Sequence, residues 1–400
     1  MRSVDEHLAE ILAEIRPIAP IELGLLEAEG GVLTEDVTAS HPLPSFDNSA
    51  MDGYAVHAAD VSGARPGSPV TLPVVGEVVA GDTGAYAVTH GAAIRIMTGA
   101  QLPAGADTVV PVEWTDGGAT KVEVRQAAEP GHAIRRTGED LHAGDQVLPA
   151  GKRVGPVQLG LLAAAGRSAV PVRPRPRVAV LSTGNELAEP GTPVTPGRIW
   201  ESNSFMLAAA ARQAGSIAYR RGAVRDDPRA LMAAIEDQLM RADVLVTSGG
   251  VSMGGEHDVV KDTLGRLGSV EFTKVAMQPG MPQGFGLVGA DQTPIFTLPG
   301  NPVSAYVSFQ LFVRPALRAL QGLDPQPPRT VQAMLTAPLR SPAGKRSFAR
   351  AQLERAVVTP LSGQGSHQLA SLAAANALII VPESVTELAM GDEAEVMWLP

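Results

Sequence analysis

Three short apolar segments, each followed by a loop of small residues, constrain the fold of this chain more than any other feature. They read RVAVL-STGNE at 177–186, DVLV-TSGGVS at 243–252 and PIFTL-PGNP at 294–302. Short apolar runs rich in β-branched residues and bounded by Gly or Pro predict strands. Three such strands in a region of alternating strands and helices predict a parallel α/β sheet, whose ligand site lies at the carboxyl ends of the strands.

The middle segment has the most chemical content. Gly249 and Gly250 break the strand, and Glu256, His257 and Asp258 follow directly. A glycine-rich loop before a helix exposes backbone N–H groups, which bind anions. An anion cradle beside carboxylates predicts phosphate recognition with a metal ion, or proton transfer. A tight glycine turn with a solvated acidic tail is the alternative interpretation.

The bulk composition narrows the class of protein. A chain of 400 residues with 44 % apolar residues predicts several globular domains. The net charge of −10 argues against nucleic-acid binding, so an anionic substrate would need local basic patches. Two candidate patches are Arg135-Arg136, and Lys345-Arg346 with Arg350. The absence of cysteine excludes disulfides and thiolate chemistry.

No apolar run approaches the length of a membrane span, and the N-terminus lacks the pattern of a signal peptide. We therefore expect a cytoplasmic protein that binds neither membranes nor nucleic acids.

Local patterns predict several further elements. We expect helices at 3–16 (with a Ser3–Glu6 capping box), 21–31, 157–165, 203–214 and from Pro228 onward. Asp227 is the expected N-cap of the last helix, which leaves Asp226 without a structural role. Residues 70–124 and 331–400 predict two small β domains, and the Pro-rich stretches 173–176 and 321–329 predict linkers. The loop at 41–54 is either a packed functional loop or a linker.

Seven stretches, in order along the chain, resemble one known family, the molybdopterin molybdenumtransferases (MoeA and the E domain of gephyrin). They are FDNSAMDGYAV at 46–56, IRIMTGA at 94–100, IRRTGED at 134–140, STGNEL at 182–187, RDDP at 225–228, TSGGVS at 247–252 and LPGNPVSA at 298–305. Each motif is weak by itself, but seven in order are specific.

The resemblance implies a multidomain subunit of α/β and β parts. An elongated helical and linker domain would comprise 1–45 and 141–175, with an inserted small β module at 46–140. Residues 176–325 would form a three-layer α/β molybdopterin-binding domain with a parallel sheet, and 326–400 a C-terminal β-barrel. Homodimers whose clefts are shared between subunits are also implied.

The implied reaction is the insertion of molybdate into adenylylated molybdopterin, which yields molybdenum cofactor and releases AMP. The substrates would be molybdate and adenylylated molybdopterin, and the cofactor would be Mg²⁺. The adenylyltransferase of the preceding step could hand the adenylylated molybdopterin over. A substrate with a pyrophosphate bridge would need glycine-rich loops of the kind found here. Mg²⁺ would need only a few carboxylates, because it keeps several waters and takes few protein ligands. The adenylyltransferase itself and a gephyrin-like scaffold are the alternative functions.

The resemblance also implies the site residues. The catalytic set is Asp52, Asp140, Glu186, Asp226 and Asp258, of which Glu186, Asp226 and Asp258 would hold the metal. The substrate-binding set is Thr98, Thr183, Gly184, Ser248, Gly249, Gly250, Ser252, Lys274, Pro299, Gly300, Asn301, Pro302, Arg350 and Ser366. We expect Arg350 and Ser366 to donate to molybdate from the barrel.

One stretch departs from the family pattern. The family commonly shows Lys-Pro-Gly-Lys-Pro, whereas this chain has Gln278-Pro-Gly-Met281-Pro. Two cations that would face an anionic substrate are therefore missing.

Overall fold

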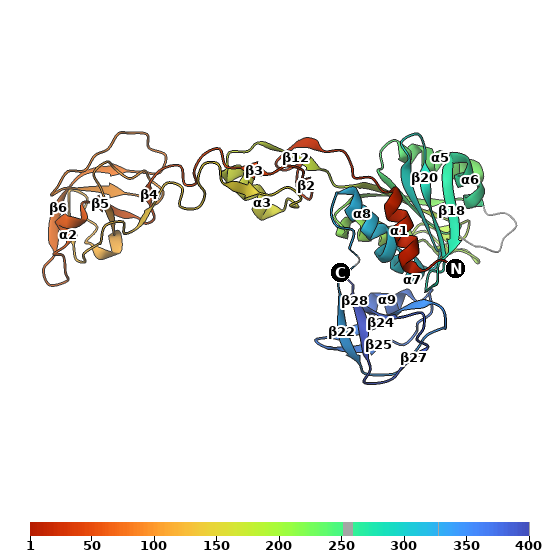
Figure 1. Cartoon of the computed structure of the whole chain (residues 1–400). Coiled ribbons are helices and arrows are strands. Elements are labelled where there is room, and N and C mark those ends of the chain that lie inside the picture. The colour runs from red at the N-terminus through yellow and green to blue at the C-terminus, as the bar shows by residue number, and fades with distance from the viewer. Residues whose placement is uncertain (251–258, 327, 400) are drawn as a thin grey trace. The chain divides into compact units, whose positions relative to one another are not determined.

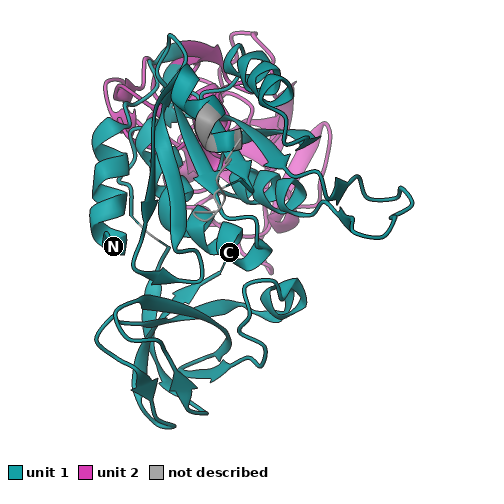
Figure 2. Ribbon diagram, turned by 90° about the vertical axis from the view of Figure 1, so that its right-hand side faces the viewer, with its two compact units in different colours: residues 1–21, 30–32, 171–400 teal, residues 22–29, 33–170 magenta. Residues whose placement is uncertain are grey.

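The structure is a computed structural model that describes residues 1–250, 259–326 and 328–399 (Figure 1). The predicted site residues Ser252 and Asp258 lie outside the described residues, as do Glu256 and His257. The chain divides into two compact units (Figure 2). Unit 1 comprises 1–21, 30–32 and 171–400, and unit 2 comprises 22–29 and 33–170.

Unit 1 contains a six-stranded sheet with the order β16-β13-β17-β21-β20-β18. The strands are β16 (Ile217–Val224), β13 (Arg177–Thr183), β17 (Val244–Ser248), β21 (Thr293–Leu298), β20 (Pro282–Val288) and β18 (Gly268–Lys274). The first four are parallel, and β20 is antiparallel to both of its neighbours. The three predicted strand–loop units are therefore adjacent parallel strands, as the sequence predicted.

Helices cover both faces of this sheet. One face packs on α1 (Val4–Glu14), α4 (Asn203–Gln213) and the continuous helical run α7 (Pro302–Ser308), η2 (Phe309–Val313) and α8 (Arg314–Leu320). The other face packs on α5 (Pro228–Leu239) and α6 (Val259–Leu267). Alternate residues of one strand serve the two cores: Val180 lies in the first and Leu181 in the second. This is the predicted three-layer α/β domain.

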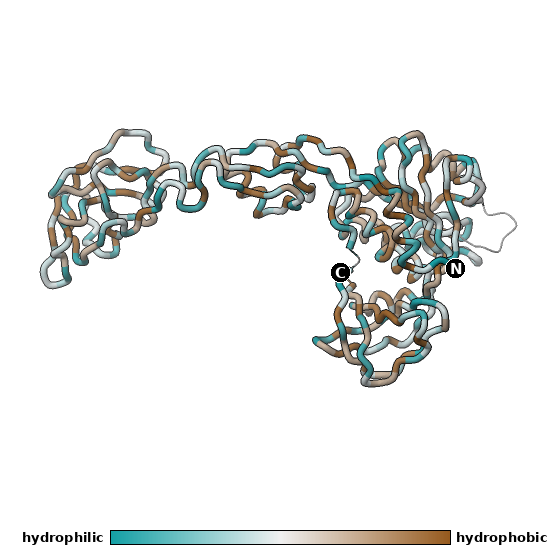
Figure 3. The backbone as a smooth tube through the Cα atoms, in the orientation of Figure 1, coloured by the Kyte–Doolittle hydropathy of each residue, from teal (hydrophilic) through white to brown (hydrophobic). Residues whose placement is uncertain are grey.

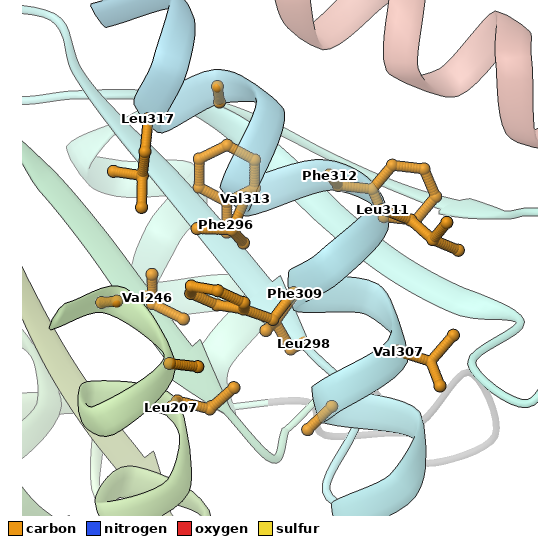
Figure 4. Close-up of a cluster of buried hydrophobic side chains, with 14 of the residues drawn as sticks. Leu207, Val246, Phe296, Leu298, Val307, Phe309, Leu311, Phe312, Val313 and Leu317 are labelled. Carbon is orange, nitrogen blue, oxygen red and sulfur yellow. The ribbon is translucent and has the colours of Figure 1, made fainter. Parts of the chain in front are cut away.

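The first core is the larger one, and Figure 4 shows its centre. Phe309 and Phe312 from η2 lie with Phe296 of β21 and Val246 of β17 in one buried cluster. Burial of such side chains stabilises the fold by roughly 1.5–3 kcal/mol each. This core holds the carboxyl ends of β17 and β21 against the helices that follow them.

The C-terminal part of unit 1 is a closed β-barrel, as predicted. Five strands follow the order β24-β25-β22-β28-β26, and a further β24–β26 pairing closes the ring. They are β22 (Thr330–Leu335), β24 (Arg346–Glu354), β25 (Val357–Pro360), β26 (Ala377–Val381) and β28 (Glu393–Trp398). The short elements β19 (Met277–Gln278), β23 (Leu339–Arg340), β27 (Glu387–Leu388) and α9 (Leu369–Ala374) accompany them.

Unit 2 contains a five-stranded sheet with the order β8-β5-β7-β6-β9, which is the predicted small β module. Its strands are β5 (Gly53–Val56), β6 (Val70–Val78), β7 (Ala93–Ile96), β8 (Thr108–Pro111) and β9 (Lys121–Val124). Unit 2 also contains the short elements β3 (Val37–Thr38), β4 (Asn48–Ser49), α2 (Ala58–Val61), η1 (Val112–Trp114), β10 (Ile134–Arg135), β11 (Gln146–Leu148) and α3 (Pro156–Ala164). The strands β1 (Ile21–Gly24), β2 (Val32–Leu33) and β12 (Ala169–Arg173) form a further small sheet, and β14 (Leu187–Ala188) pairs with β15 (Ile199–Trp200).

Most of the predicted helix boundaries are confirmed, and one prediction is wrong. The Ser3–Glu6 capping box is present on α1, and Asp227 caps α5 through the Ala230 N–H at 2.8 Å. The predicted helix at 21–31 is instead strand β1 followed by turns. Leu26 is 81 % exposed and Leu23 and Leu25 are only partly buried, so the leucines of this segment do not form the fully buried face that would stabilise a short helix.

Figure 3 shows hydrophobic residues on the central strands of unit 1 and on the helices that pack against them. Among the described residues, no helix is long and apolar enough to span a membrane.

Candidate functional site

A cavity of about 800 Å³ lies at the carboxyl ends of the four parallel strands in unit 1. It brings together most of the predicted substrate-binding residues of the three loops. The predicted substrate-binding residues that line it are Thr183, Gly184, Ser248, Gly249, Gly250, Pro299, Gly300, Asn301 and Pro302, and the predicted catalytic residues Glu186 and Asp226 line it too. Because β16 is also parallel to β13, Asp226 reaches this edge of the sheet from a fourth strand that the three-loop pattern did not include.

Asp226 is held by a reciprocal pair of hydrogen bonds with Asn185. The Asn185 N–H donates to Asp226 Oδ2 at 3.2 Å, and the Asp226 N–H donates to Asn185 Oδ1 at 3.3 Å. Asp226 is exposed and Glu186 is exposed, and both line the cavity. The cavity therefore has two carboxylates that solvent and ligand can reach.

The Gly249 position tolerates no side chain. Its φ is +91°, and a Cβ would lie 2.4 Å from the Thr183 carbonyl oxygen. Its N–H donates to the Leu298 carbonyl oxygen at 3.1 Å. The glycine thus lets the loop after β17 lie directly against its two neighbouring strands.

The buried floor of the cavity is a hydrogen-bonded network around Glu201, whose side chain is 1 % exposed. Glu201 Oε1 accepts from the Ser182 hydroxyl at 2.6 Å and from the Ser204 N–H at 2.7 Å. Glu201 Oε2 accepts from the Ser204 hydroxyl at 2.6 Å and pairs with Arg220 at 3.5 Å. The Ser182 and Ser248 hydroxyl oxygens are 3.0 Å apart.

This network has a fixed direction. A carboxylate only accepts hydrogen bonds, so the Ser182 proton points to Glu201 and the Ser182 oxygen accepts from Ser248. The Ser248 proton is therefore engaged inside the floor. Arg220 closes the other end, because its Nε donates to the Ser204 oxygen at 2.7 Å and its guanidinium lies 3.8 Å above the Phe205 ring centre.

Asn203 connects α4 to the loop after β21. Its Nδ2 donates to the Gly300 carbonyl oxygen at 2.7 Å, which fixes the orientation of the amide because a carbonyl can only accept. Its Oδ1 is buried and has no hydrogen-bond partner within the described ranges. A buried acceptor that lacks a donor costs free energy of folding.

The barrel contributes His367 and Leu369 to the cavity. The Val303 N–H donates to the Ser366 carbonyl oxygen at 3.1 Å, so the loop before α9 contacts the start of α7. Within the described chain, the predicted residues Ser366, Arg350 and Lys274 do not line the cavity.

Arg350 has a different environment from the one that we expected. It is 1 % exposed, and its guanidinium donates to the carbonyl oxygens of Gly363 at 2.6 Å and Gly365 at 3.2 Å. Its Nε donates to the Ser371 hydroxyl at 3.2 Å. Burial lowers the pKa of Arg350 from its ordinary value. The guanidinium thus holds the loop that leads to Ser366 and His367, because its Nε and Nη2 donate to this part of the barrel.

Two other residues of the candidate basic patches, Arg346 and Arg136, also have structural partners. Arg346 pairs with Asp5 at 2.8 Å and with Glu383 at 3.1 Å, and Arg136 pairs with Asp47 at 2.6 Å. The hydrogen bond to Arg346 is the main cause of the lowered pKa of Asp5. These two arginines thus connect segments that are far apart in sequence.

In the stretch 278–282, which departs from the family pattern, Gln278 lies exposed in β19 and Met281 is partly buried. The Met281 carbonyl oxygen accepts from the Val275 N–H at 2.8 Å.

The predicted residues of unit 2 include one close pair. Asp52 Oδ1 accepts from both the N–H and the hydroxyl of Thr98, each at 2.7 Å. These bonds, the hydroxyl one first, lower the pKa of the Asp52 carboxyl. Asp140 is exposed and its N–H donates to the Leu43 carbonyl oxygen at 3.0 Å.

The sequence interpretation missed several polar or aromatic cavity residues, among them Trp200, Glu201, Ser202, Asn203 and His367. The segment WESN at 200–203 follows no apolar strand pattern, but it directly precedes a predicted helix start. The polar residues at this helix start were the signal from which these site residues could have been predicted.

Comparisons with known proteins agree with this architecture. Residues 2–166 match the model of the MoeA N-terminal region (domain I and II), 179–319 that of a probable molybdopterin binding domain, and 332–399 that of the MoeA C-terminal region (domain IV). The chain is 51 % identical to molybdopterin molybdenumtransferase 2 of Mycobacterium tuberculosis over 405 residues, which covers 99 % of each chain.

More distant relatives match over nearly the same length. The chain is 36 % identical to molybdopterin molybdenumtransferase of Bacillus subtilis over 376 residues, covering 91 % of this chain and 86 % of that protein. A crystal structure of the molybdopterin biosynthesis MoeA protein from Pyrococcus horikoshii matches with 30 % identity and a TM-score of 0.75, covering 100 % of both chains. The chain belongs to the molybdopterin molybdenumtransferase (MoeA) family.

Proposed function

We propose that this protein inserts molybdate into adenylylated molybdopterin, with formation of molybdenum cofactor and release of AMP. The observation that carries the proposal is the cavity itself, where three small-residue loops and two carboxylates meet at the carboxyl ends of parallel strands. Full-length relatives named molybdopterin molybdenumtransferase support the same reaction. No observation favours the adenylyltransferase or the scaffold.

In this proposal the pyrophosphate of the substrate lies against the loops after β17 and β21. Gly249 and Gly250 allow close approach of an anion to the backbone, and Asn203 keeps the Gly300 loop in place. The floor around Glu201 holds the ends of β13 and β17 in register beneath it.

The donors fit Mg²⁺ as the required cation. Mg²⁺ binds through one or two carboxylates together with substrate phosphates and waters. Glu186 and Asp226 supply two such carboxylates, and Asp258 is the proposed third ligand. Within the described residues, which do not include Asp258, no group of three acidic, histidine or cysteine side chains is close enough to hold a metal ion. The ion would neutralise charge on the pyrophosphate.

For the chain's own groups we propose the following roles. Asp226, held by Asn185, orients a cation or accepts a proton, and Glu186 faces the same cavity. Arg350 positions the loop of Ser366, which we propose as a molybdate donor, together with Lys274.

We further propose that the protein works in the cytoplasm as a homodimer whose clefts are shared, with Asp52, Thr98 and Asp140 completing the cleft of the partner. The adenylyltransferase of the preceding step could hand its product to this cleft. Heterodimers of an Asp52→Ala subunit with an Asp226→Ala subunit should regain part of the activity, because one cleft would be intact. No recovery in verified heterodimers would count against shared clefts.

The experiment that separates the three functions uses purified protein with two substrate mixtures. With adenylylated molybdopterin, molybdate and Mg²⁺, we expect AMP release and formation of cofactor. With molybdopterin and ATP, we expect no adenylylation. Adenylylation in the second mixture would replace the proposal by the adenylyltransferase, and no reaction in either would favour the scaffold.

A further inference from the structure

One wall of the cavity is a small ribbon, formed by β14 and β15, that is too short to hold its own position. Each of its two strands is two residues long. Ile199 and Trp200 of β15 line the cavity, and they are 58 % and 57 % exposed. An isolated two-stranded ribbon is marginally stable at best in water. A fixed wall therefore needs contacts from outside the ribbon.

Glu189, which directly follows β14, supplies such a contact. Arg220 Nη2 donates to both carboxylate oxygens of Glu189, each at 2.6 Å. Arg220 is itself held by the floor of the cavity, because its Nε donates to the Ser204 hydroxyl oxygen at 2.7 Å and its guanidinium lies over the Phe205 ring. It also pairs with the buried Glu201 at 3.5 Å. One guanidinium thus joins the buried floor to the first residue after the ribbon strand.

The strand that carries Arg220 leaves space for this ion pair. The register of β16 against β13 shifts at Arg221, which forms a β-bulge between Arg220 and Gly222. Gly222 has a φ of +85°, and a Cβ on it would lie 2.8 Å from Glu189 Oε1. A residue without a side chain therefore provides the space that the Glu189 carboxylate fills beside the guanidinium.

Hydrogen bonds connect Glu189 to the far end of the ribbon. The N–H and the hydroxyl of Thr192 donate to the Glu189 carbonyl oxygen at 3.2 Å and 2.6 Å. The Thr192 carbonyl oxygen in turn accepts from the Trp200 Nε1–H at 3.0 Å. The turn that Arg220 holds through Glu189 therefore also holds the indole in the cavity wall.

On these grounds we propose that Glu189 and Arg220 are positioning residues, which hold the ribbon in place as a wall against the substrate. The inference rests on the proposed function. In the described part of the chain, neither residue lines the cavity, so both act through the ribbon. A fixed wall contacts the substrate alike before and during the reaction, so the ion pair should affect KM rather than kcat.

The first measurement is amide hydrogen exchange of the ribbon in the full-length protein. The Ile199 N–H donates to the Glu186 carbonyl oxygen at 2.9 Å, so its exchange reports opening of the ribbon. The Glu201 N–H, which donates to the Ala188 carbonyl oxygen at 2.8 Å, is a second reporter. Glu189→Ala should speed both exchanges about two- to fivefold, which is the contribution of a partly exposed ion pair.

Asp237→Ala is the matched control, because Asp237 pairs with Arg241 at 2.9 Å on α5 and does not line the cavity. It should leave the exchange of the ribbon unchanged. Arg220 is a poor site for the test, because its loss would leave the buried Glu201 without its cation. Exchange of the ribbon that is as slow in Glu189→Ala as in the wild type would overturn the proposal.

The second measurement is the steady-state kinetics of the same variants with adenylylated molybdopterin. Glu189→Ala should raise KM about two- to fivefold and leave kcat within about twofold of the wild type. Glu189→Gln should raise KM less, because its amide oxygen still accepts from Arg220. An unchanged KM despite faster exchange of the ribbon, or a lower kcat with an unchanged KM, would overturn the positioning role.

The two measurements together distinguish this inference from the proposed function. Cofactor formation by the wild type, with a KM that does not depend on Glu189, removes the positioning role alone. A wild type that forms no cofactor removes the proposed function, whereas faster exchange in Glu189→Ala would still show that the ion pair anchors the ribbon.

Discussion

Ser182 donates its hydroxyl proton to Glu201 at 2.6 Å, and both side chains are 1 % exposed beneath the cavity. One carboxylate thereby fixes the ends of two parallel strands, since Ser182 of β13 also bonds to Ser248 of β17. A buried acid at this place holds the ligand loops in register without contacting solvent.

Glu201→Gln should therefore destabilise the protein. The amide keeps the shape of the carboxylate but removes the charge from the Ser182, Ser204 and Arg220 contacts, and hydrogen bonds to a buried charged group contribute about 1.5–3 kcal/mol. We expect the free energy of unfolding to fall by about that amount in urea titration. Glu189→Gln is the control, because Glu189 pairs with the same Arg220 but its side chain is 46 % exposed, so its loss should cost under about 1 kcal/mol. Equal losses in both variants would contradict a special role for the floor.

Asp226→Asn should keep the fold and lose turnover. The amide retains an oxygen for the Asn185 N–H but lacks the charge that faces the cavity. We expect kcat for AMP release to fall about 100-fold or more, as when a single charge-stabilising group is removed from an active site. Asp237→Asn, an exposed acid of α5 paired with Arg241, should leave kcat unchanged. An Asp226→Asn protein with wild-type kcat would remove Asp226 from the mechanism.

Because His7 is buried, we expect the free energy of unfolding to fall in mild acid. Its side chain is buried against Phe312, and burial, with a smaller contribution from Arg2, lowers its pKa from 6.5 to about 4. Between these values the unfolded chain binds the proton and the folded chain does not, so stability falls as the pH falls below about 6.5. At pH 5 this single group costs about 2 kcal/mol relative to pH 7.5.

The measurement is the free energy of unfolding at pH 7.5 and pH 5 for the wild type and His7→Leu. The variant should show a smaller loss between the two pH values, whatever its stability at pH 7.5. Identical pH dependence in the two proteins would contradict a buried neutral histidine.

Gln278 and Met281 give a prediction about molybdate. Lysines at these positions would each offer a positive charge to an oxyanion, and charge-assisted hydrogen bonds are roughly twice as strong as neutral ones. If the anion site adjoins this stretch, the double change Gln278→Lys, Met281→Lys should lower the molybdate concentration needed for half-maximal cofactor formation. No change in the double variant, with molybdate dependence lost in Ser366→Ala, would locate the anion nearer the barrel loop. Arg350→Ala is a poor probe of this question, because Arg350 is buried and holds that loop.

The sequence predicted the α/β sheet well because its signals are local. Whether a short apolar segment forms a strand and ends at a small-residue loop is decided mostly by residues close to it in sequence. The strands β13, β17 and β21 lie where these patterns predicted them. The capping box of Ser3 and the N-cap of Asp227 are local for the same reason. The strand β1 was missed because its pairing partner, β12, lies far away in sequence.

The site was predicted in part, for the same physical reason. Loops at strand ends could be placed together from topology, but Glu201 and Asn203 act through partners that only the folded sheet brings near, such as Ser182 and Gly300. The role of Arg350 could not be predicted from the sequence. An arginine in a strand gives the same sequence pattern whether its guanidinium faces a ligand or, as here, carbonyl groups of its own domain.

The most direct test of the account is the molar ratio of AMP released to molybdenum cofactor formed in a single sample of purified protein. With adenylylated molybdopterin, Mg²⁺ and molybdate, we predict about one AMP per cofactor, with neither product formed by Asp226→Asn at a comparable rate. AMP release by the wild type without cofactor, or cofactor formation that is unaffected by Asp226→Asn, would contradict it.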